Sequence, residues 1–373
     1  MIHRIHIENF KSLRDVTVEL SPVTVFIGRS GTGKSNFASA IQFLRDYLAF
    51  GPRQGFGQQD EKWKCATNPS GAIGFEVEFD VPGFEDRFRY TLDLDDRNLG
   101  NHPQAESLVC GDKMIFRQAR QGPQGSRWEK EPPLVTVPQP GPVALGRLPG
   151  LEKAVIAYIA ITAGIGVYSF PYDVLRKPTG GEKESGLADD AGNYLRVLKD
   201  VTSSLQDIAT RKGIAAALRR VNPTVGSVEL DSVQNPTKAF VGHCLREKTL
   251  PLELAQESDG FRRFYAHLLA LYQTPPKQTL VFEEPENGIY PGALSLLADE
   301  FKAAPEAGRG QVLLTTHSPA LLDHFSVDQI RVVDLVELET RIGPLVEEQR
   351  QAIVEELLHA GELLTVDPAR TGA

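Results

Sequence analysis

Cysteine is scarce in this chain, with three among 373 residues, and methionine and tryptophan are rarer still. Cys65, Cys110 and Cys244 are scattered and form no C-x-x-C pair, so the sequence predicts neither a zinc site nor a disulfide framework. We expect buried or idle thiols in a reducing compartment.

Long apolar runs and an excess of positive charge are also missing. No stretch approaches the ~20 apolar residues of a membrane-spanning helix, and the alternating start at residues 1–7 is typical of a strand, not of a signal peptide. A formal net charge of −9 argues against a surface coated in basic residues for nucleic acid, while leaving room for a local positive groove. We therefore expect a soluble, cytoplasmic protein with no membrane partner.

What the sequence does contain is a glycine-rich stretch with an informative spacing. Residues 28–35 follow the pattern G-x-x-x-x-G-K-[ST], typical of a loop whose backbone N–H groups close around a polyphosphate. Lys34 would reach the β- and γ-phosphates, and the Ser35 hydroxyl would bind Mg²⁺. The candidate ATP-binding residues are Gly28, Arg29, Ser30, Gly31, Thr32, Gly33, Lys34, Ser35 and Asn36.

The flanking residues favour this interpretation over a chance match in a glycine-rich turn. Residues 23–27 are β-branched or aromatic and suit a short buried strand, and residues 36–50 carry apolar side chains at a helical period. Strand, loop and helix follow one another in the order that a phosphate-binding loop requires.

Elsewhere the pattern predicts a β-rich first part and a helical middle. Strands are expected at 2–7, 16–20, 73–81, 87–94, 113–117, 225–230, 239–246, 250–255, 279–284, 311–316 and 329–336. Helices are expected at 151–163, 189–202, 204–221, 261–272, 320–324 and 347–359, with no heptad repeat for a long coiled coil. Residues 51–71 should form an exposed loop, and residues 118–150 should contain no regular element. The basic residues at 211, 212, 219 and 220 are better explained as a solvated helix face than as a DNA contact.

The predicted strand at 279–284 ends in two adjacent carboxylates. A continuous apolar strand is typical of a buried parallel strand, whose carboxyl end delivers side chains to a ligand. Glu283 would hold Mg²⁺, directly or through water, and Glu284 would orient or deprotonate a water beside the γ-phosphate. Taken alone, this stretch is more simply an element that enters a charged surface turn.

Two further positions are candidates by similar reasoning. His317 follows the buried-strand pattern at 311–316 and can sense a γ-phosphate by hydrogen bonding, although a lone histidine is more often structural. Ser258-Asp259-Gly260 opens the helix at 261–272, where free N–H groups can bind an anion. Without a dimer, an ordinary helix cap is the better explanation of that segment.

In combination, these motifs resemble the ABC-type ATPase heads of the RecF, SMC and OLD superfamily. The ordered set consists of Phe10-Lys11-Ser12, the loop at 28–36, Ser258-Asp259-Gly260, Glu283-Glu284-Pro285-Glu286 and Thr316-His317-Ser318-Pro319. An ordered set of this kind is far more specific than any single motif. The Glu-Glu-Pro-Glu form is most similar to stand-alone OLD-like AAA family ATPases that lack a nuclease domain.

The resemblance implies an α/β P-loop NTPase fold, namely an ABC-ATPase head with a mixed central sheet, an antiparallel β lobe and an inserted helical lobe. Residues 1–373 would form a single domain. Its nucleotide-binding core would comprise 1–164 and 275–345, its helical signature lobe 165–274, and its C-terminal helix and tail 346–373.

The resemblance also implies Mg²⁺-dependent ATP hydrolysis. Lys34, Glu284 and His317 would be catalytic, and Ser35 and Glu283 would be the Mg²⁺ ligands, all acting on the ATP of their own subunit.

Assembly is implied as well. Ser258, Asp259 and Gly260 would face the γ-phosphate bound by the partner of a homodimer, so that hydrolysis depends on dimerisation. A DNA-linked role follows by analogy. The chain would control a separate nuclease or toxin in anti-phage defence, or a DNA repair process, and DNA is itself a candidate ligand.

Two positions depart from the family's pattern, because Ser30 stands where Asn is common and Tyr290 stands where His is common. The family's glutamine loop is not identifiable, since Gln58, Gln59 and Gln118 lie in irregular stretches. The chain ends soon after 359, so we expect no nuclease domain behind the ATPase.

Alternatives stay open. One is a RecF-like clamp that binds duplex DNA, and another is an ATP-binding switch or scaffold with negligible hydrolysis. A transporter ATPase is disfavoured, because Ser-Asp-Gly departs from the transporter signature.

Overall fold

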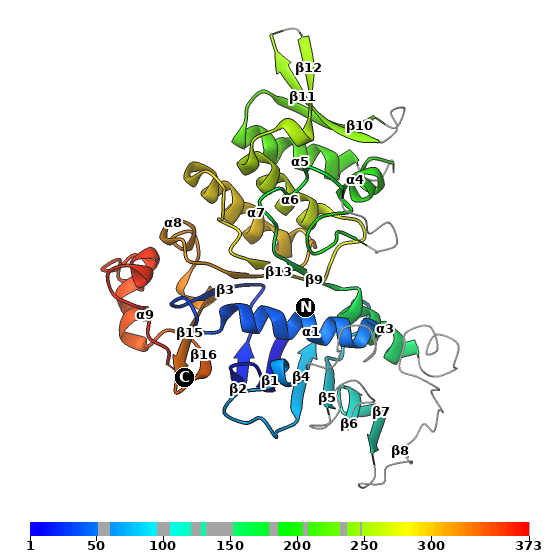
Figure 1. The fold of residues 1–373 in the computed structure, drawn as a ribbon, viewed down its shortest axis with the longest axis vertical. Helices are drawn as coiled ribbons and strands as arrows, with labels where there is room; N and C mark the ends of the chain where they lie inside the picture. Colours follow the sequence, from blue (N-terminus) through cyan, green and yellow to red (C-terminus); the bar gives the residue numbers. More distant parts are fainter. Residues whose placement is uncertain are drawn as a thin grey trace. The chain divides into compact units, whose positions relative to one another are not determined.

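The structure is a computed structural model that describes residues 1–50, 60–94, 105–120, 128–131, 152–178, 186–203, 208–231, 237–246 and 248–372 (Figure 1). The chain divides into two compact units. The first unit comprises Met1–Ile165, Val327–Leu358 and Pro368–Ala373, and the second comprises Gly166–Ser326 and His359–Asp367. Within the described ranges, no helix combines the length and the apolar character needed to cross a membrane.

An antiparallel sheet forms much of the first unit. Its strands are ordered β2-β1-β4-β5-β6-β7-β8. Their bounds are β1 (Ile2–Phe10), β2 (Leu13–Glu19), β4 (Ile73–Phe79), β5 (Phe88–Leu94), β6 (Ala105–Cys110), β7 (Lys113–Arg120) and β8 (Trp128–Glu131). Phe75, Val77 and Phe79 are buried while Glu76 and Glu78 are half-exposed, so β4 has the two-sided pattern that its alternation predicts.

The phosphate-loop strand β3 (Val23–Ile27) is fully buried, as a parallel strand covered on both faces should be. It pairs in parallel with β15 (Ile330–Val336), which pairs antiparallel with β16 (Glu339–Gly343). Helix α1 (Lys34–Phe50) follows the loop and packs on β1 and on α3 (Glu152–Thr162) (Figure 1). The remaining elements of this unit are η1 (Asp60–Trp63), η5 (Val327–Gln329) and α9 (Glu347–Val354).

In the second unit, β13 (Thr279–Glu283) pairs in parallel with β14 (Gln311–Thr315) and lies beside β9 (Ile165–Tyr168). Its helices are α4 (Tyr194–Ser203), α5 (Ile208–Val221), α6 (Asp259–Tyr272), α7 (Leu294–Glu306) and α8 (Pro319–Leu322). Helix α6 contacts α4, α5 and α7. An antiparallel sheet of β10 (Val225–Asp231), β11 (Lys238–Leu245) and β12 (Lys248–Glu253) extends from the helices (Figure 1). The short elements are η3 (Leu254–Gln256), η4 (Pro291–Ala293) and η6 (Ala360–Leu364).

The predicted fold class is confirmed, but the sequence pattern missed several elements. β6, β9, β16 and α7 were not predicted, and β7 and β8 enter a stretch that was expected to hold no element. β6 mixes polar and apolar residues without a clear period, and its strand conformation comes from pairing with β5 and β7 on either side. Pairing of this kind is set by neighbours distant in sequence, which a local pattern does not contain.

The prediction of an exposed loop at 51–71 is confirmed in part, because Lys62, Ala66, Thr67, Pro69 and Ser70 are exposed but two residues near them are anchored; 51–59 lie outside the described residues. Cys65 is buried, and the Trp63 ring stacks on Phe10 at 5.7 Å between ring centroids. The Lys11 N–H also donates to the Trp63 carbonyl at 2.7 Å. A large aromatic ring and a small thiol therefore anchor a stretch that its glycines and polar residues made look solvent-exposed.

Two predicted helices are shorter than expected. The helix predicted at 189–202 begins at Tyr194, because the Asn193 side chain closes a turn by accepting from Ala188 N and donating to Gly186 O, both at 2.8 Å. The helix predicted at 347–359 ends at Val354, where Glu356 adopts a φ of 59° and the Leu357 and Leu358 N–H groups both donate to Ala352 O.

The core of the second unit surrounds a histidine. His267 on α6 lies among the rings of Phe170, Phe282 and Phe301, at centroid distances of 4.9, 5.4 and 6.0 Å. Its Nδ1 donates to the Arg263 carbonyl at 2.7 Å. Burial lowers the pKa of His267 to about 4, because the apolar surroundings disfavour the charged ring.

This histidine predicts a pH dependence of stability. The unfolded chain binds the His267 proton near pH 6.5 and the folded chain only near pH 4, so acid favours the unfolded state. We expect the free energy of unfolding to fall by up to ~1.4 kcal/mol per pH unit between those values from this residue alone. The measurement is urea denaturation at pH 8, 6 and 5 for wild type and His267→Phe. The variant should lose less stability on acidification, and equal slopes would contradict the prediction.

Candidate functional site

The loop from Gly28 to Ser35 has the conformation that its glycines predict. A Cβ at Gly28 would lie 2.1 Å from the Val333 carbonyl oxygen, and Gly31 and Gly33 adopt φ values of 83° and 109°. Lys34 is buried, and its Nζ donates to the carbonyls of Gly28 and Arg29 at 2.8 and 2.9 Å. The loop therefore folds around its own lysine, whose ammonium group contacts neutral carbonyls that phosphate oxygens can replace.

The loop exposes the groups that a nucleotide would need. Arg29, Ser30, Gly31 and the Ser35 side chain are exposed at the start of α1, a helix of 17 residues. The first N–H groups of a helix lack intrahelical acceptors and carry partial positive charge, so they favour an anion. Backbone donors, the lysine and the serine hydroxyl thus belong to one structural element.

A chain of hydrogen bonds holds this loop from behind. Asn36 Nδ2 donates to Ser12 Oγ at 2.7 Å, and Ser12 Oγ lies 2.6 Å from Thr340 Oγ1. Thr340 Oγ1 donates to the Thr32 carbonyl at 2.7 Å, so the Ser12 hydroxyl must be the donor to Thr340. Each group thus donates to the next one, from α1 through the β1–β2 turn and β16 to the loop.

Sequence reasoning missed the role of Thr340 and only half-identified that of Ser12. Strands predicted at 2–7 and 16–20 left Ser12 in a connection, whereas β1 and β2 run up to Lys11-Ser12, a two-residue turn with Lys11 at a φ of 50°. Phe10-Lys11-Ser12 was noticed only as part of the family resemblance. Thr340 lies far along the chain in an unpredicted strand, and no local signal indicates it.

In the second unit, Glu284 is held in a strained turn just after β13. It has a φ of 45°, and its N–H donates to the Thr315 carbonyl at 3.1 Å. One carboxylate oxygen accepts from Asn287 Nδ2 at 2.8 Å, and the other lies 3.7 Å from His317 Nε2. Both side chains remain accessible, at 41% for Glu284 and 35% for His317. The structure thus brings two predicted catalytic residues together, with Glu283 directly before them at the end of β13.

A third carboxylate fixes the position of the histidine. Glu286 Oε1 accepts from Thr316 Oγ1 and from the His317 N–H, both at 2.8 Å. Its Oε2 is buried and has no hydrogen-bond partner among the described residues. Glu286 therefore joins the turn after β13 to the turn after β14, a positioning role that its motif alone did not indicate.

The predicted signature segment lies beside the same turn. Ser258 caps α6 by accepting from the Phe261 N–H at 3.3 Å, which confirms the capping interpretation. A Cβ added at Gly260 would lie 3.0 Å from the Gly288 carbonyl oxygen, so the start of α6 packs on the turn that follows Glu286.

Asp259 takes part in a local network on the same helix. It accepts a hydrogen bond from Tyr172 and another from the fully buried Arg262, and Arg176 lies 3.6 Å away. The Tyr172 hydrogen bond and the neighbouring guanidinium groups lower the pKa of Asp259 below its ordinary value. Its carboxylate is thus engaged by neighbouring side chains, whereas Ser258 is solvent-exposed.

The described residues contain no cluster of three or more His, Cys, Asp or Glu side chains that could hold a metal by themselves. Mg²⁺ commonly uses one or two protein oxygens together with substrate phosphates. The exposed Ser35 hydroxyl and the half-exposed Glu283 carboxylate are oxygen donors of that kind. Gln58 and Gln59 lie outside the described residues, as does the Gln118 side chain, so the glutamine loop stays unassigned.

Comparisons with known proteins match two segments of the chain. A family model described as "AAA ATPase domain" matches residues 1–85, and one described as "AAA domain, putative AbiEii toxin, Type IV TA system" matches residues 167–323. No curated protein sequence matches the chain.

Solved structures of SMC heads share the fold. An Smc head bound to the C-terminal winged-helix domain of ScpA has a TM-score of 0.58 at 13% identity, covering 94% of this chain and 99% of its own. The Pyrococcus furiosus Smc head bound to the C-terminal domain of ScpA has a TM-score of 0.58 at 11% identity, covering 95% and 99%. The chain therefore has the fold of SMC heads, and two of its segments match models of AAA domains.

The hydrogen-bond chain behind the loop predicts a remote effect on nucleotide affinity. Thr340→Val keeps the side-chain size but leaves the Thr32 carbonyl without its donor. We expect ATP affinity to fall about tenfold, the equivalent of about 1.4 kcal/mol, through loss of loop order. Titration with a fluorescent ATP analogue measures this change in affinity.

Two variants calibrate that titration. Lys34→Ala should abolish binding, and Thr17→Val, on an exposed position of β2, should leave it unchanged. Wild-type affinity in Thr340→Val would mean that the loop holds its shape without this support.

Proposed function

We propose that this chain hydrolyses ATP with Mg²⁺ and dimerises around the nucleotide. The observation that carries the proposal is the phosphate-binding loop, which is closed over Lys34 and leads into a long helix. This arrangement suits a polyphosphate because it offers a lysine and several backbone donors at once.

Glu284 is our proposed general base. Its carboxylate is accessible and fixed by Asn287, which suits a group that must accept a proton from a positioned water. His317, 3.7 Å away and held by Glu286, is the proposed γ-phosphate sensor. We propose that this pair and Lys34 act on the same ATP molecule, following the order of motifs in the ABC-type heads.

Ser35 and Glu283 are the proposed Mg²⁺ ligands, since hydroxyl and carboxylate oxygens suit this hard cation. Mg²⁺ would supply neutralisation of the charge on the phosphate oxygens during transfer to water. The chain's own contribution is to hold the phosphates with Lys34 and the loop N–H groups, and to accept the proton of the attacking water at Glu284.

Dimerisation is proposed through the exposed start of α6. Ser258 is solvent-exposed and its helix begins with free backbone donors, so a γ-phosphate held by a second subunit could be bound there. Because the same helix start packs on the turn after Glu286, such a contact would be felt at Glu284 and His317.

We further propose an OLD-like role in which the ATP-bound dimer controls a separate nuclease or toxin, or another DNA-directed process. Support comes from the Glu-Glu-Pro-Glu form and from the toxin and antitoxin wording of the matching family model. SMC heads bind ScpA in the solved structures, which is a precedent for a protein partner on this fold. Purification from the native host followed by identification of co-purifying proteins would test for the partner.

A second candidate is an ATP switch with negligible turnover. It is favoured by Ser30 and by Tyr290, which departs from the family pattern and is 76% exposed directly after the catalytic turn. The measured turnover rate of the wild-type protein separates the two functions.

Glu284→Gln tests the hydrolytic role. Glutamine retains the acceptor for Asn287 but is a very weak base, so the turn should keep its structure. We expect normal ATP affinity, a turnover rate lower by about 10²–10⁴-fold, and accumulation of the dimer. A phosphate-release assay measures the turnover rate, and light scattering measures the accumulation of the dimer. If this variant kept the wild-type turnover rate, another residue would have to accept the proton of the attacking water.

Ser258→Arg tests assembly. The larger cation should block the approach of a second subunit while monomers still bind ATP. Ser258→Ala is the matched control, because it loses the same helix cap at a cost of about 1 kcal/mol without adding bulk. In sedimentation with a slowly hydrolysed ATP analogue, wild type and Ser258→Ala should form dimers, whereas Ser258→Arg should stay monomeric. If Ser258→Arg still formed dimers, the start of α6 would not lie in the dimer interface.

A further inference from the structure

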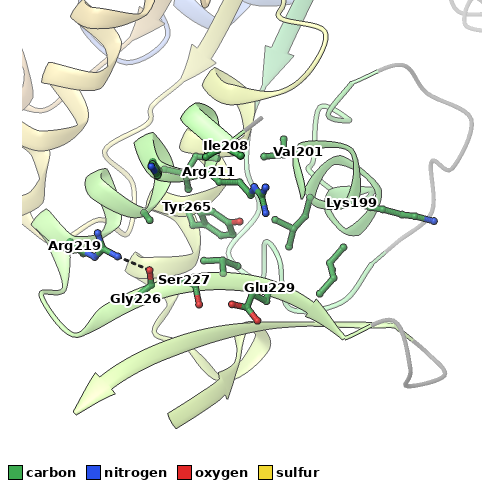
Figure 2. A pocket seen from close by; sticks show the side chains of 15 residues that line it. Lys199, Val201, Ile208, Arg211, Arg219, Gly226, Ser227, Glu229 and Tyr265 are labelled. Atoms are coloured by element: carbon green, nitrogen blue, oxygen red, sulfur yellow. Dashed lines mark hydrogen bonds between the residues drawn. The ribbon is translucent and has the colours of Figure 1, made fainter. Parts of the chain in front are cut away.

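A pocket of about 710 Å³ lies within the second unit, lined by residues of α4, α5, α6 and β10 (Figure 2). This volume is in the range of sites that hold small organic molecules, roughly 300–1,000 Å³. Apolar side chains form much of its wall, among them Leu198, Val201, Ile214, Val228 and Leu230. None of its residues belongs to the phosphate-binding loop, the acidic turn or the signature segment.

Tyr265 contributes an unsatisfied polar group to this wall. Its side chain is fully buried, and its hydroxyl has no hydrogen-bond partner within the described part of the chain. Burial raises the pKa of Tyr265, so the hydroxyl is a neutral donor at physiological pH. Buried hydroxyls normally have acceptors, and an acceptor on a ligand would supply the missing one.

Arg211 brings a positive charge to the same place. Figure 2 shows its guanidinium group and the Tyr265 hydroxyl directed toward the same part of the pocket. Arg211 is solvent-exposed and takes part in none of the hydrogen bonds or ion pairs found among the described residues. Arg219, by contrast, donates to the carbonyls of Val225 and Gly226 at 2.9 and 2.7 Å, and Lys199 points away from the pocket.

The charges of the lining are unbalanced. Among the described residues, Arg211, Lys212 and Arg219 line the pocket, and the one acidic residue of the lining, Glu229, is exposed on β10. In a chain with a formal net charge of −9, this local excess of positive charge favours an anionic ligand. The basic residues of α5 were predicted to form a solvated helix face, and all four are solvent-exposed; three of them, Arg211, Lys212 and Arg219, also line this pocket.

We propose that this pocket binds a small organic anion with an apolar body. Its carboxylate, sulfonate or phosphate group is held by the Arg211 guanidinium and accepts a hydrogen bond from the Tyr265 hydroxyl. Its apolar part packs against the side chains of Ile214 and Val228. Binding here is separate from nucleotide binding, whose proposed loop belongs to the first unit.

The test uses 8-anilinonaphthalene-1-sulfonate, an aromatic anion whose fluorescence rises in apolar sites, titrated into the full-length protein. N-phenyl-1-naphthylamine, which lacks the sulfonate, is the neutral probe. Arg211→Gln should weaken binding of the anion about tenfold, the usual size of a lost charge-assisted hydrogen bond, and leave the neutral probe unaffected. Arg220→Gln is the matched control on the same helix, because Arg220 contacts Asp299 and does not line the pocket.

Two more substitutions separate binding from folding. Tyr265→Phe removes a hydroxyl that has no partner in the described chain, so it should keep the melting temperature and weaken only the anionic probe. Ala215→Phe should fill the pocket and weaken both probes, whereas Ala216→Phe, exposed one position further along α5, should weaken neither. The proposal would be overturned if wild type, Arg211→Gln and Ala215→Phe bound the anionic probe equally well. It would also be overturned if the controls Arg220→Gln and Ala216→Phe lost as much affinity as Arg211→Gln and Ala215→Phe.

Discussion

The hydrogen-bond chain from Asn36 through Ser12 and Thr340 to the Thr32 carbonyl is the constraint on which the candidate nucleotide site depends. A phosphate-binding loop works only if several backbone donors converge, and glycines allow that geometry without enforcing it. The enforcement comes from partners far apart in sequence, in the β1–β2 turn and in β16. Gly33 is tied to the same support, since a Cβ there would lie 2.1 Å from Thr340 Oγ1. Loop and support are therefore one structure.

The acidic turn of the second unit follows a comparable design. Glu284 is strained and accessible, while Glu286 beside it is sequestered by Thr316 and the His317 N–H. The two carboxylates of this motif thus differ in role: Glu284 is accessible to solvent, and Glu286 accepts hydrogen bonds that hold the turn. Helix α6 adds a further connection, because its start packs on this turn and its middle carries both His267 in the core and Tyr265 at the pocket. One helix accordingly contacts the candidate catalytic turn, the core and the proposed anion site.

Sequence reasoning succeeded where chemistry is local. The strand at 23–27 was predicted with its observed bounds, and a helix cap was predicted within the segment Ser258-Asp259-Gly260, because burial pattern and capping depend on near neighbours. It failed where pairing partners are remote, as with β6 and β16, and where one aromatic residue anchors a polar stretch, as Trp63 does. The candidate site residues were chosen by residue type, whereas the support that Thr340 gives the loop carries no local signal. The pocket beside Tyr265 was not predicted either, since an unsatisfied hydroxyl is visible only once its surroundings are known.

By itself, the sequence determined the class of chemistry: a glycine-rich loop with its lysine and serine, an acidic strand end and a following histidine, in an order typical of ABC-type heads. These are covalent facts of residue type and spacing. Tertiary structure alone decided which of those groups are accessible, which carboxylate lies in a strained turn and which is held by hydrogen bonds, and what holds the loop closed. The physical reason is that hydrogen-bond partners and burial are set by contacts between residues hundreds of positions apart, such as Ser12 and Thr340, and no local pattern contains them.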